Sequence, residues 1–340
     1  MKIRGAVHIS VVSALIIAVS LSANASTRFI GSPGYVSGIK TEQVSSKITN
    51  TPNSNAADPF LNKQWALEKI HISALQDITA GISGPLVAIL DTGIDRNHPD
   101  LEGNVVAEVN FTDSPTVNDR NGHGTHVAGI IAANTDNGIG VAGVAPQSRL
   151  MNVKVAGDDG ICRAATVARG IVWAADNGAK IINVSLEMGP SAELEQAVKY
   201  AWNKGAIIIA AAGNSASSKP VYPAYYVNCI AAAGTSQDDD LAPLSNYGDW
   251  VDIAAPGFLI FSTLPGEKYG YENGTSSAAA YVSGIAALLM CTVIDTNGNG
   301  RTNDEVRAII ESSGQKIDID GMGNGRIDAA ICAEKAGNLK

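Results

Sequence analysis

Three short segments of the chain carry the residue types needed for nucleophilic catalysis. Asp91 ends the apolar run Val-Ala-Ile-Leu, His123 stands in Asn-Gly-His-Gly-Thr-His, and Ser276 stands in Asn-Gly-Thr-Ser-Ser-Ala-Ala. A serine hydroxyl is a weak nucleophile and needs a neighbouring base, which in turn needs a carboxylate that fixes its tautomer. The three segments therefore predict acyl-transfer chemistry with Ser276 as nucleophile, His123 as base and Asp91 as the orienting carboxylate.

The local sequence around each residue suits the predicted role. His123 lies between two glycines, where backbone can approach closely, and is expected to open a helix over 123–133. Ser276 precedes a small-residue helical run over 278–289, so the helix dipole would favour negative charge at its side chain. Each residue alone is more often structural, and the prediction depends on all three occurring in the order Asp, His, Ser.

Asn214 is a candidate donor to the reaction intermediate. It follows Ala-Ala-Gly at the end of an apolar run. A tetrahedral intermediate carries an oxyanion that needs preorganised hydrogen-bond donors. The Asn214 amide is expected to supply one donor and the backbone N–H of Ser276 another, while the alternative interpretation of Asn214 is a turn residue.

The elements that must position these residues alternate along the chain. Apolar runs predict buried strands and amphipathic stretches predict helices; the strands are expected at 86–90, 150–155, 180–185 and 206–212, and the helices at 163–177, 192–204, 304–312 and 328–333. This alternation predicts an α/β fold with a parallel twisted sheet covered by helices on both faces. Sites in such folds lie at the carboxyl ends of the strands, where Asp91, Ser185 and Asn214 fall.

The composition is that of an acidic, folded protein. Hydrophobic residues make up 45% of the 340 residues, which is typical of a packed enzyme. The formal net charge of −9 argues against binding to nucleic acid or to anionic membranes. We expect a monomer that acts on polypeptides.

The N-terminus has the pattern of an export signal. Lys2 and Arg4 precede an apolar run over 11–21, and Ala-Asn-Ala follows at 23–25. The run is too short for a spanning helix, so we expect a signal peptide over 1–25 rather than a membrane anchor, and a secreted protein. Residues 26–57 are predicted to be a short leader or pro-segment, and residues 58–340 the catalytic domain.

Export bears on the four cysteines, which are Cys162, Cys229, Cys291 and Cys332. An oxidising compartment and an even count predict up to two disulfides, with three possible connectivities. Buried thiols are the alternative.

From about Asp58 to its end the chain resembles the subtilisin family of serine proteases. The resemblance is carried by the three segments above and by further stretches at 195–205, 211–214, 222–226 and 250–257. It implies a subtilisin-like fold and a secreted endopeptidase that forms an acyl-enzyme, with Asn214 in the oxyanion hole.

The same resemblance implies which residues bind the substrate. Gly160, Ser185 and Leu186 match two edge strands that pair with an extended substrate, and Val221 would give the primary specificity pocket an apolar floor. Glu187 stands where the family usually has glycine. Its carboxylate would either favour basic side chains or point to solvent.

A second departure from the family follows the nucleophile, where Ala280 replaces a proline and restores a backbone N–H. A specialised processing protease or a transpeptidase is therefore an alternative to a broad endopeptidase. A non-catalytic, calcium-dependent binding protein is a third hypothesis. His126, three residues after His123, is expected to be structural because no third metal ligand accompanies the pair.

The resemblance also implies Ca²⁺ as a cofactor. The ligands would be the side chains of Asp58, Asp100 and Asn137 together with the backbone carbonyls of Asn134, Ile139 and Val141. The alternative is a hydrogen-bonded surface loop.

A further loop, Asp-Thr-Asn-Gly-Asn-Gly at 295–300, begins like an EF-hand. Its twelfth position is Val306 instead of glutamate, so the bidentate ligand is absent and a turn-rich insertion is expected.

Overall fold

The computed structural model describes residues 26–27, 44–45 and 57–338. Its centre is a nine-stranded sheet with the order β13-β14-β10-β9-β8-β7-β3-β5-β4, in which every pair is parallel except β13 with β14. The strands are β3 (Leu86–Asp91), β4 (Val105–Asn110), β5 (Arg149–Lys154), β7 (Ile181–Val184), β8 (Ile207–Ala211), β9 (Cys229–Thr235), β10 (Ile253–Pro256), β13 (Gly314–Gln315) and β14 (Arg326–Ile327).

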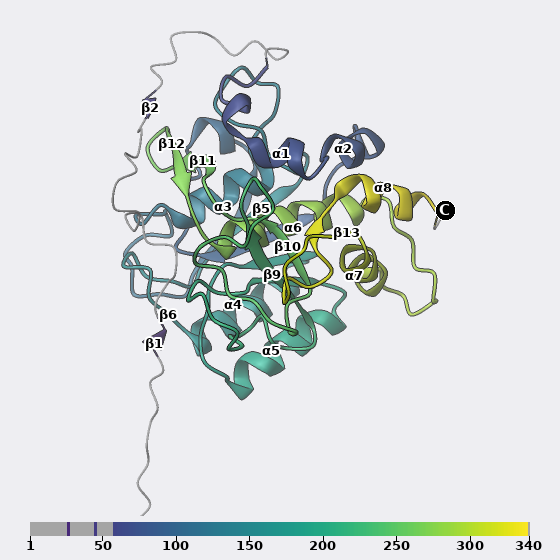
Figure 1. Cartoon of the computed structure of the whole chain (residues 1–340). Helices are drawn as coiled ribbons and strands as arrows, with labels where there is room; N and C mark the ends of the chain where they lie inside the picture. The colour runs from purple at the N-terminus through teal and green to yellow at the C-terminus, as the bar shows by residue number, and fades with distance from the viewer. Residues whose placement is uncertain (1–25, 28–43, 46–56, 339–340) are drawn as a thin grey trace, which may run out of the picture.

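Helices cover both faces of this sheet (Figure 1). One face carries α3 (His123–Ala132) and α6 (Thr275–Leu289), with α2 (Ser73–Thr79), α7 (Asn303–Ser312) and α8 (Ala329–Gly337) packed around α6. The other face carries α4 (Ala164–Asp176) and α5 (Ala192–Asn203). A short helix, α1 (Trp65–Lys69), precedes α2.

The strands are apolar throughout because both of their faces are buried. In β3, Val87 and Ile89 pack into the hydrophobic cluster that includes α3 and α6, whereas Ala88 and Leu90 pack into the cluster beneath α4 and α5. The predicted fold class, a parallel sheet with helices on both faces, is confirmed.

The predicted elements match the observed ones to within a few residues. The main difference is at α6, which begins at Thr275 instead of position 278, so that Ser276 lies inside the first helical turn. The second difference is α8, which runs to Gly337 and not to position 333.

Two small sheets complete the fold. One joins β11 (Ile260–Leu264), β12 (Lys268–Glu272) and β2 (Val44–Ser45), and the other joins β1 (Ser26–Thr27) to β6 (Cys162–Arg163). The predicted signal peptide over 1–25 lies outside the described residues, as does most of the predicted leader over 26–57. None of the helices in the described part of the chain is long and apolar enough to span a bilayer.

The disulfide prediction is wrong in this structure. All four cysteines lie among the described residues, and all are thiols. Cys162 and Cys229 belong to the cluster under α4 and α5, but Cys229 begins β9 whereas Cys162 follows the far end of β5. Cys332 lies on the opposite face, and Cys291 donates to the Ala287 carbonyl at the end of α6. Burial raises the pKa of the Cys162 thiol to about 12, which favours the thiol over the reactive thiolate.

Candidate active site

Asp91 and His123 meet in a buried hydrogen bond where the end of β3 approaches the start of α3. His123 Nδ1 lies 2.9 Å from Asp91 Oδ1 and 3.0 Å from Oδ2. A carboxylate only accepts, so Nδ1 carries the proton and Nε2 is the basic nitrogen of the ring. Burial lowers the pKa of His123, but the Asp91 carboxylate, together with Glu272 and Asp119, outweighs that effect, so the net result is a raised pKa.

A glycine makes this close approach possible. A Cβ atom on Gly124 would lie 2.1 Å from the Gly93 carbonyl oxygen and 3.0 Å from Asp91 Oδ1. Any side chain at this position would therefore push α3 away from β3 and separate His123 from its carboxylate.

Ser276 reaches the same edge of the sheet from the N-terminus of α6. Its Oγ lies 3.4 Å from the Ser185 carbonyl oxygen, and the Ser185 hydroxyl donates to the Ser276 carbonyl at 3.1 Å. Ser185 directly follows β7, whose Val184 pairs with Leu90 of β3. The sheet register therefore places Ser276 next to the strand end that carries Asp91.

Asn214 follows β8 and is fixed by the residue before Ser276. Its Oδ1 accepts hydrogen bonds from the Thr275 N–H at 2.8 Å and from the Thr275 hydroxyl at 3.1 Å. Because the amide oxygen is held by Thr275, the amide nitrogen is directed to the other side, where it lies 3.0 Å from the position of a Cβ on Gly274. An N–H donor thus stands beside the start of α6, as an oxyanion site requires.

The predicted substrate-binding residues lie on two backbone segments near this edge. Gly160 has a φ of +78° in a turn that an antiparallel bridge between Ala156 and Cys162 closes. The side chain of Leu186 is buried in the cluster under α4 and α5, so this residue can offer a ligand only its backbone.

Glu187 turns its carboxylate inward. Its Oε2 atom is buried and accepts no hydrogen bond within the described residues. It packs so closely on Gly213 that a Cβ there would lie 2.2 Å from it. Burial raises the pKa of Glu187, and a hydrogen bond from the Asn214 N–H lowers it in part. The alternative of a solvent-facing Glu187 is therefore not the geometry found.

Val221 lies on the segment that pairs with the segment carrying Glu187. The next residues in each segment, Met188 and Tyr222, form an antiparallel bridge with hydrogen bonds of 2.9 and 3.1 Å. Val221 is partly buried and packs against the cluster under α4 and α5. The residues assigned to the specificity pocket are thus brought together by one bridge.

Two residues that hold the site in place, Asp119 and Thr275, were not predicted from the sequence. The buried Asp119 carboxylate accepts from the N–H groups of Asn121, Gly122 and Thr125 and from the hydroxyls of Thr92 and Thr125, at 2.7–2.9 Å. The signal was an aspartate four residues before a helix whose capping residue is glycine and has no side-chain acceptor. Thr275 could be found only once Asn214 was located beside it.

His126 and Ala280 both lie in buried positions within helices. His126 is buried, and its Nε2 lies 3.0 Å from the Ile260 carbonyl oxygen. Ala280 is buried inside α6, which continues without interruption to Leu289.

The residues predicted to bind calcium either belong to the loop 134–141 or contact it. Asp58 accepts from the N–H groups of Asp136 and Asn137 at 3.0 and 3.2 Å. Asp100 accepts from the Asn137 amide at 2.9 Å and from the Val141 N–H at 2.8 Å. Burial raises the pKa of both carboxyls, that of Asp100 to about 7. Two buried carboxyls thus face one loop, and their oxygens are of the kind that a hard cation binds.

The other predicted ligands belong to the same loop. The Asn134 N–H donates to the Asp100 carbonyl at 2.8 Å, and the Ile139 N–H donates to Asn137 Oδ1 at 2.8 Å. Within the described residues, no three His, Cys, Asp or Glu side chains form a cluster arranged for a metal ion. The predicted site needs only two carboxylates, because amide and carbonyl oxygens supply the rest.

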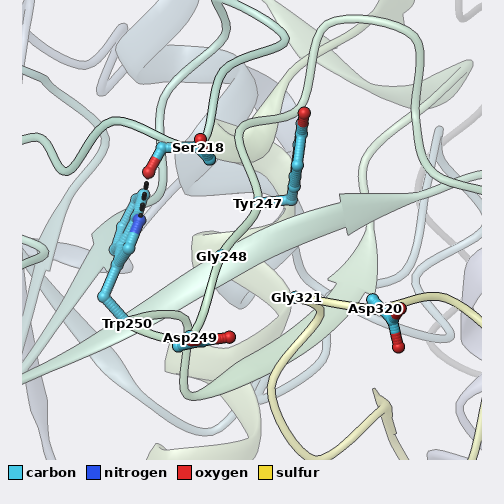
Figure 2. Close-up of a pocket in the computed structure, with 7 residues that line it drawn as sticks. All are labelled: Ser218, Tyr247, Gly248, Asp249, Trp250, Asp320 and Gly321. Carbon is cyan, nitrogen blue, oxygen red and sulfur yellow. Dashed lines mark hydrogen bonds between the residues drawn. The ribbon is translucent and has the colours of Figure 1, made fainter.

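Two surface pockets lie apart from the predicted catalytic residues. Figure 2 shows one of them, in which the Trp250 indole N–H donates to the Ser218 carbonyl at 3.0 Å. It is lined by Ser218, Tyr247, Gly248, Asp249, Trp250, Asp320 and Gly321. The other lies between α4 and α5. Neither is lined by a predicted catalytic residue.

Comparisons with known proteins agree with this geometry. Residues 83–326 match the model of the subtilase family, Peptidase_S8. The chain is 45% identical over 285 residues to thermitase from Thermoactinomyces vulgaris, covering 82% of this chain and 98% of that protein. It is 45% identical over 227 residues to subtilisin BL from Lederbergia lenta, covering 66% of this chain and 83% of the relative.

A solved structure has the same fold. It is described as proteases from Pseudoalteromonas arctica PAMC 21717, with a TM-score of 0.75 and 29% identity, and the match covers 83% of this chain and 99% of that one. The hypothesis of a non-catalytic binding protein is therefore set aside. The chain belongs to the subtilase family and is a serine-type endopeptidase.

Proposed function

We propose that Ser276, His123 and Asp91 form the catalytic triad and that the protein hydrolyses peptide bonds through an acyl-enzyme. The observation that carries this proposal is the buried hydrogen bond between His123 Nδ1 and Asp91, which leaves Nε2 as a base at the edge of the sheet where Ser276 lies in the first turn of α6.

The reaction follows from these positions. His123 Nε2 takes the proton of the Ser276 hydroxyl as Oγ attacks the substrate carbonyl carbon, and the imidazolium then gives that proton to the leaving amine. Water repeats the sequence on the acyl-enzyme and releases the acid. The Asn214 amide and the Ser276 N–H donate to the oxyanion in both steps, an interaction worth about 10²–10³ in kcat.

The direct test is hydrolysis of denatured casein by the secreted protein. We expect cleavage by the wild type and a loss of about 10⁶ in kcat for Ser276→Ala, because the remaining groups cannot form an acyl-enzyme. Casein that survives the wild type would contradict the proposal, and so would full activity in Ser276→Ala.

The substrate is proposed to bind as an added strand along Gly160 on one side and Ser185 and Leu186 on the other. Support comes from β1, an extended segment that pairs antiparallel with β6, two residues after Gly160. Backbone pairing would supply affinity with little dependence on side chains.

Glu187 is proposed to select a basic side chain on the amino side of the cleaved bond. Its buried Oε2 lacks a donor, and a guanidinium or ammonium group of the substrate would supply one. Val221 would contact the aliphatic part of that side chain.

Calcium is proposed to bind through Asp58, Asp100 and Asn137 and through the backbone carbonyls of Asn134, Ile139 and Val141. A bound Ca²⁺ would neutralise the buried carboxylates and fix the loop 134–141, which follows α3. Its role would be to stabilise the fold.

Export is proposed from the sequence of the first 25 residues. The chain would be secreted after cleavage behind Ala25. Residues 26–57 would then be a leader ahead of the catalytic domain at 58–340, and the secreted protein would be a monomer. The N-terminal sequence of the protein recovered from the medium tests this proposal.

A further inference from the structure

The connection between α6 and α7 brings carboxylate and amide groups together. It follows the end of α6 that is opposite Ser276. It contains the loop that begins at Asp295, whose twelfth position, Val306, lacks the carboxylate of an EF-hand. Because α7 begins at Asn303, its first turn brings two consecutive carboxylates, Asp304 and Glu305, against this loop.

Glu305 has a buried oxygen that nothing in the described chain satisfies. The residue is only 8% exposed. Its Oε1 accepts from the Thr296 N–H and hydroxyl at 3.0 Å each and from the Asn297 N–H at 3.3 Å, so the carboxylate faces the loop. Its Oε2 is buried and has no hydrogen-bond partner among the described residues. Such an oxygen is costly unless an external group satisfies it.

The neighbouring residue, Asp304, also has a carboxylate oxygen without a hydrogen-bond partner among the described residues. Its Oδ2 accepts from the side-chain amides of Asn297 at 2.6 Å and Asn299 at 2.8 Å. Its Oδ1 is buried and finds no partner among the described residues. Two adjacent carboxyl groups thus each present an unsatisfied oxygen.

We propose that this loop is a calcium site in which Asp304 and Glu305 replace the missing twelfth ligand. The carboxylate oxygens of Asp304 and Glu305 suit a hard cation, which takes about six to eight oxygen ligands. The side-chain amides of Asn297 and Asn299 donate to Asp304, so both residues lie beside the proposed ligands.

Asp295 holds the loop in shape for this role. Its carboxylate accepts the N–H groups of Gly298 and Gly300 at 2.7 Å each, which curls the backbone around the first-position aspartate. Asp304 and Glu305 are the two carboxylates of the proposed site, in keeping with the absence of a three-acid cluster among the described residues.

The site would link three helices. Asn303 donates from its amide to the Trp202 carbonyl of α5 at 3.0 Å, and the Arg301 guanidinium reaches the same carbonyl at 3.4 Å. Arg301 and Asn303 both lie in the sequence between Asn299 and Asp304. A cation would therefore fix the α6–α7 connection on the end of α5 and stabilise the fold without touching catalysis.

The test uses the full chain carrying Ser276→Ala, so that it does not digest itself, with and without Glu305→Gln. Glutamine keeps an acceptor for Thr296 and Asn297 and removes only the charge. We expect Glu305→Gln to bind one calcium ion fewer per chain in equilibrium dialysis and to gain less in Tm from calcium. In chelator its Tm should equal or exceed that of the parent, because a buried unpaired charge has been removed.

Matched variants separate this site from others. Glu334→Gln makes the same change at an exposed position of α8 and should leave both measurements unchanged. Asp100→Asn disables the site proposed at Asp58 and Asp100, so its loss of calcium should add to that of Glu305→Gln.

Equal calcium stoichiometry in Glu305→Gln and its parent would overturn the proposal. So would an equal drop in Tm with and without calcium, because Glu305 would then be only a structural acceptor. If Glu305→Gln does not fold, Asp295→Asn, at the partly exposed first position of the loop, is judged by the same two measurements.

Discussion

Two carboxylates beside the proposed catalytic serine, those of Asp91 and Glu187, are placed in opposite surroundings. Asp91 accepts from the Thr92 N–H at 2.7 Å and from His123, so donors satisfy its charge. Glu187 receives an N–H from Asn214, but its Oε2 has no partner among the described residues. The first carboxylate is suited to orient a base, and the second is suited to receive a cation from the substrate.

The preference for basic substrates can be tested with Glu187→Gln. Removing the charge should lower kcat/KM for peptides with arginine before the cleaved bond by about tenfold or more, because a buried charge-assisted hydrogen bond is worth about 1.5–3 kcal/mol. Peptides with a neutral residue at that position should be affected little. The measurement is the ratio of kcat/KM between the two substrates, with the exposed Glu193→Gln as a control; an unchanged ratio would show that Glu187 does not select substrates.

The raised pKa of His123 gives a pH dependence with a definite sign. His123 must be neutral to accept the Ser276 proton, so activity is lost as the pH falls through its pKa. Because Asp91 raises that pKa, the acid limb of kcat/KM should have its midpoint above 6.5, the ordinary value for histidine. A midpoint at or below 6.5 would contradict the role given to Asp91. In Asp91→Asn the loss should be about 10⁴ in kcat, because the tautomer is wrong.

At the scale of elements, the sheet register and two helix N-termini bring the site together. β3, β7 and β8 are adjacent and parallel, so the residues after them share one edge. The first residues of α3 and α6 lie at that edge of the sheet. Hydrogen bonds made by residues outside the triad hold each helix start in place.

Asp119 is the clearest case, because one carboxylate organises the first turn of α3. Replacing it in Asp119→Ala should lower the free energy of unfolding by about 2–3 kcal/mol and should lower kcat more than it raises KM, since His123 is displaced but substrate contacts remain. Asp113→Ala, an exposed acid of the same loop, is the control. Chemical denaturation and steady-state kinetics measure both effects; wild-type kcat in Asp119→Ala would exclude a positioning role.

At the scale of the whole molecule, two buried carboxylates, those of Asp58 and Asp100, hold a loop that connects distant elements. The loop 134–141 ties Asp58, at the start of the described domain, to Asp100 and to the end of α3. Neutralising that charge would join segments that are distant in sequence. Stability is therefore expected to depend on the concentration of calcium.

Removal of calcium should lower Tm in the Ser276→Ala protein. A site filled at one hundred times its Kd contributes about 2.7 kcal/mol, and Asp100→Asn should lose most of that response. The exposed Asp113→Asn should keep it. Calorimetry in calcium and in chelator gives the comparison, and a calcium response in Asp100→Asn equal to that of its parent would show that the stabilising site lies elsewhere.

The sequence by itself determined the reaction class and the fold class, together with four strands of the central sheet and six helices. Asp91, His123, Ser276 and Asn214 could be singled out as candidates because catalysis restricts residue type and local context so strongly that few alternatives fit. The strands around Val87 and Ile209 were found because both faces of a parallel sheet are buried, which makes such strands apolar throughout.

The tertiary structure alone decided what depends on contacts between distant segments. It showed that Glu187 turns inward onto Gly213, that Thr275 fixes Asn214, and that Cys162 and Cys229 lie at opposite ends of the sheet. It also placed Glu305 where the loop pattern lacked a ligand. Local sequence cannot determine these points, because the direction of a side chain is set by neighbours that only the folded chain brings together.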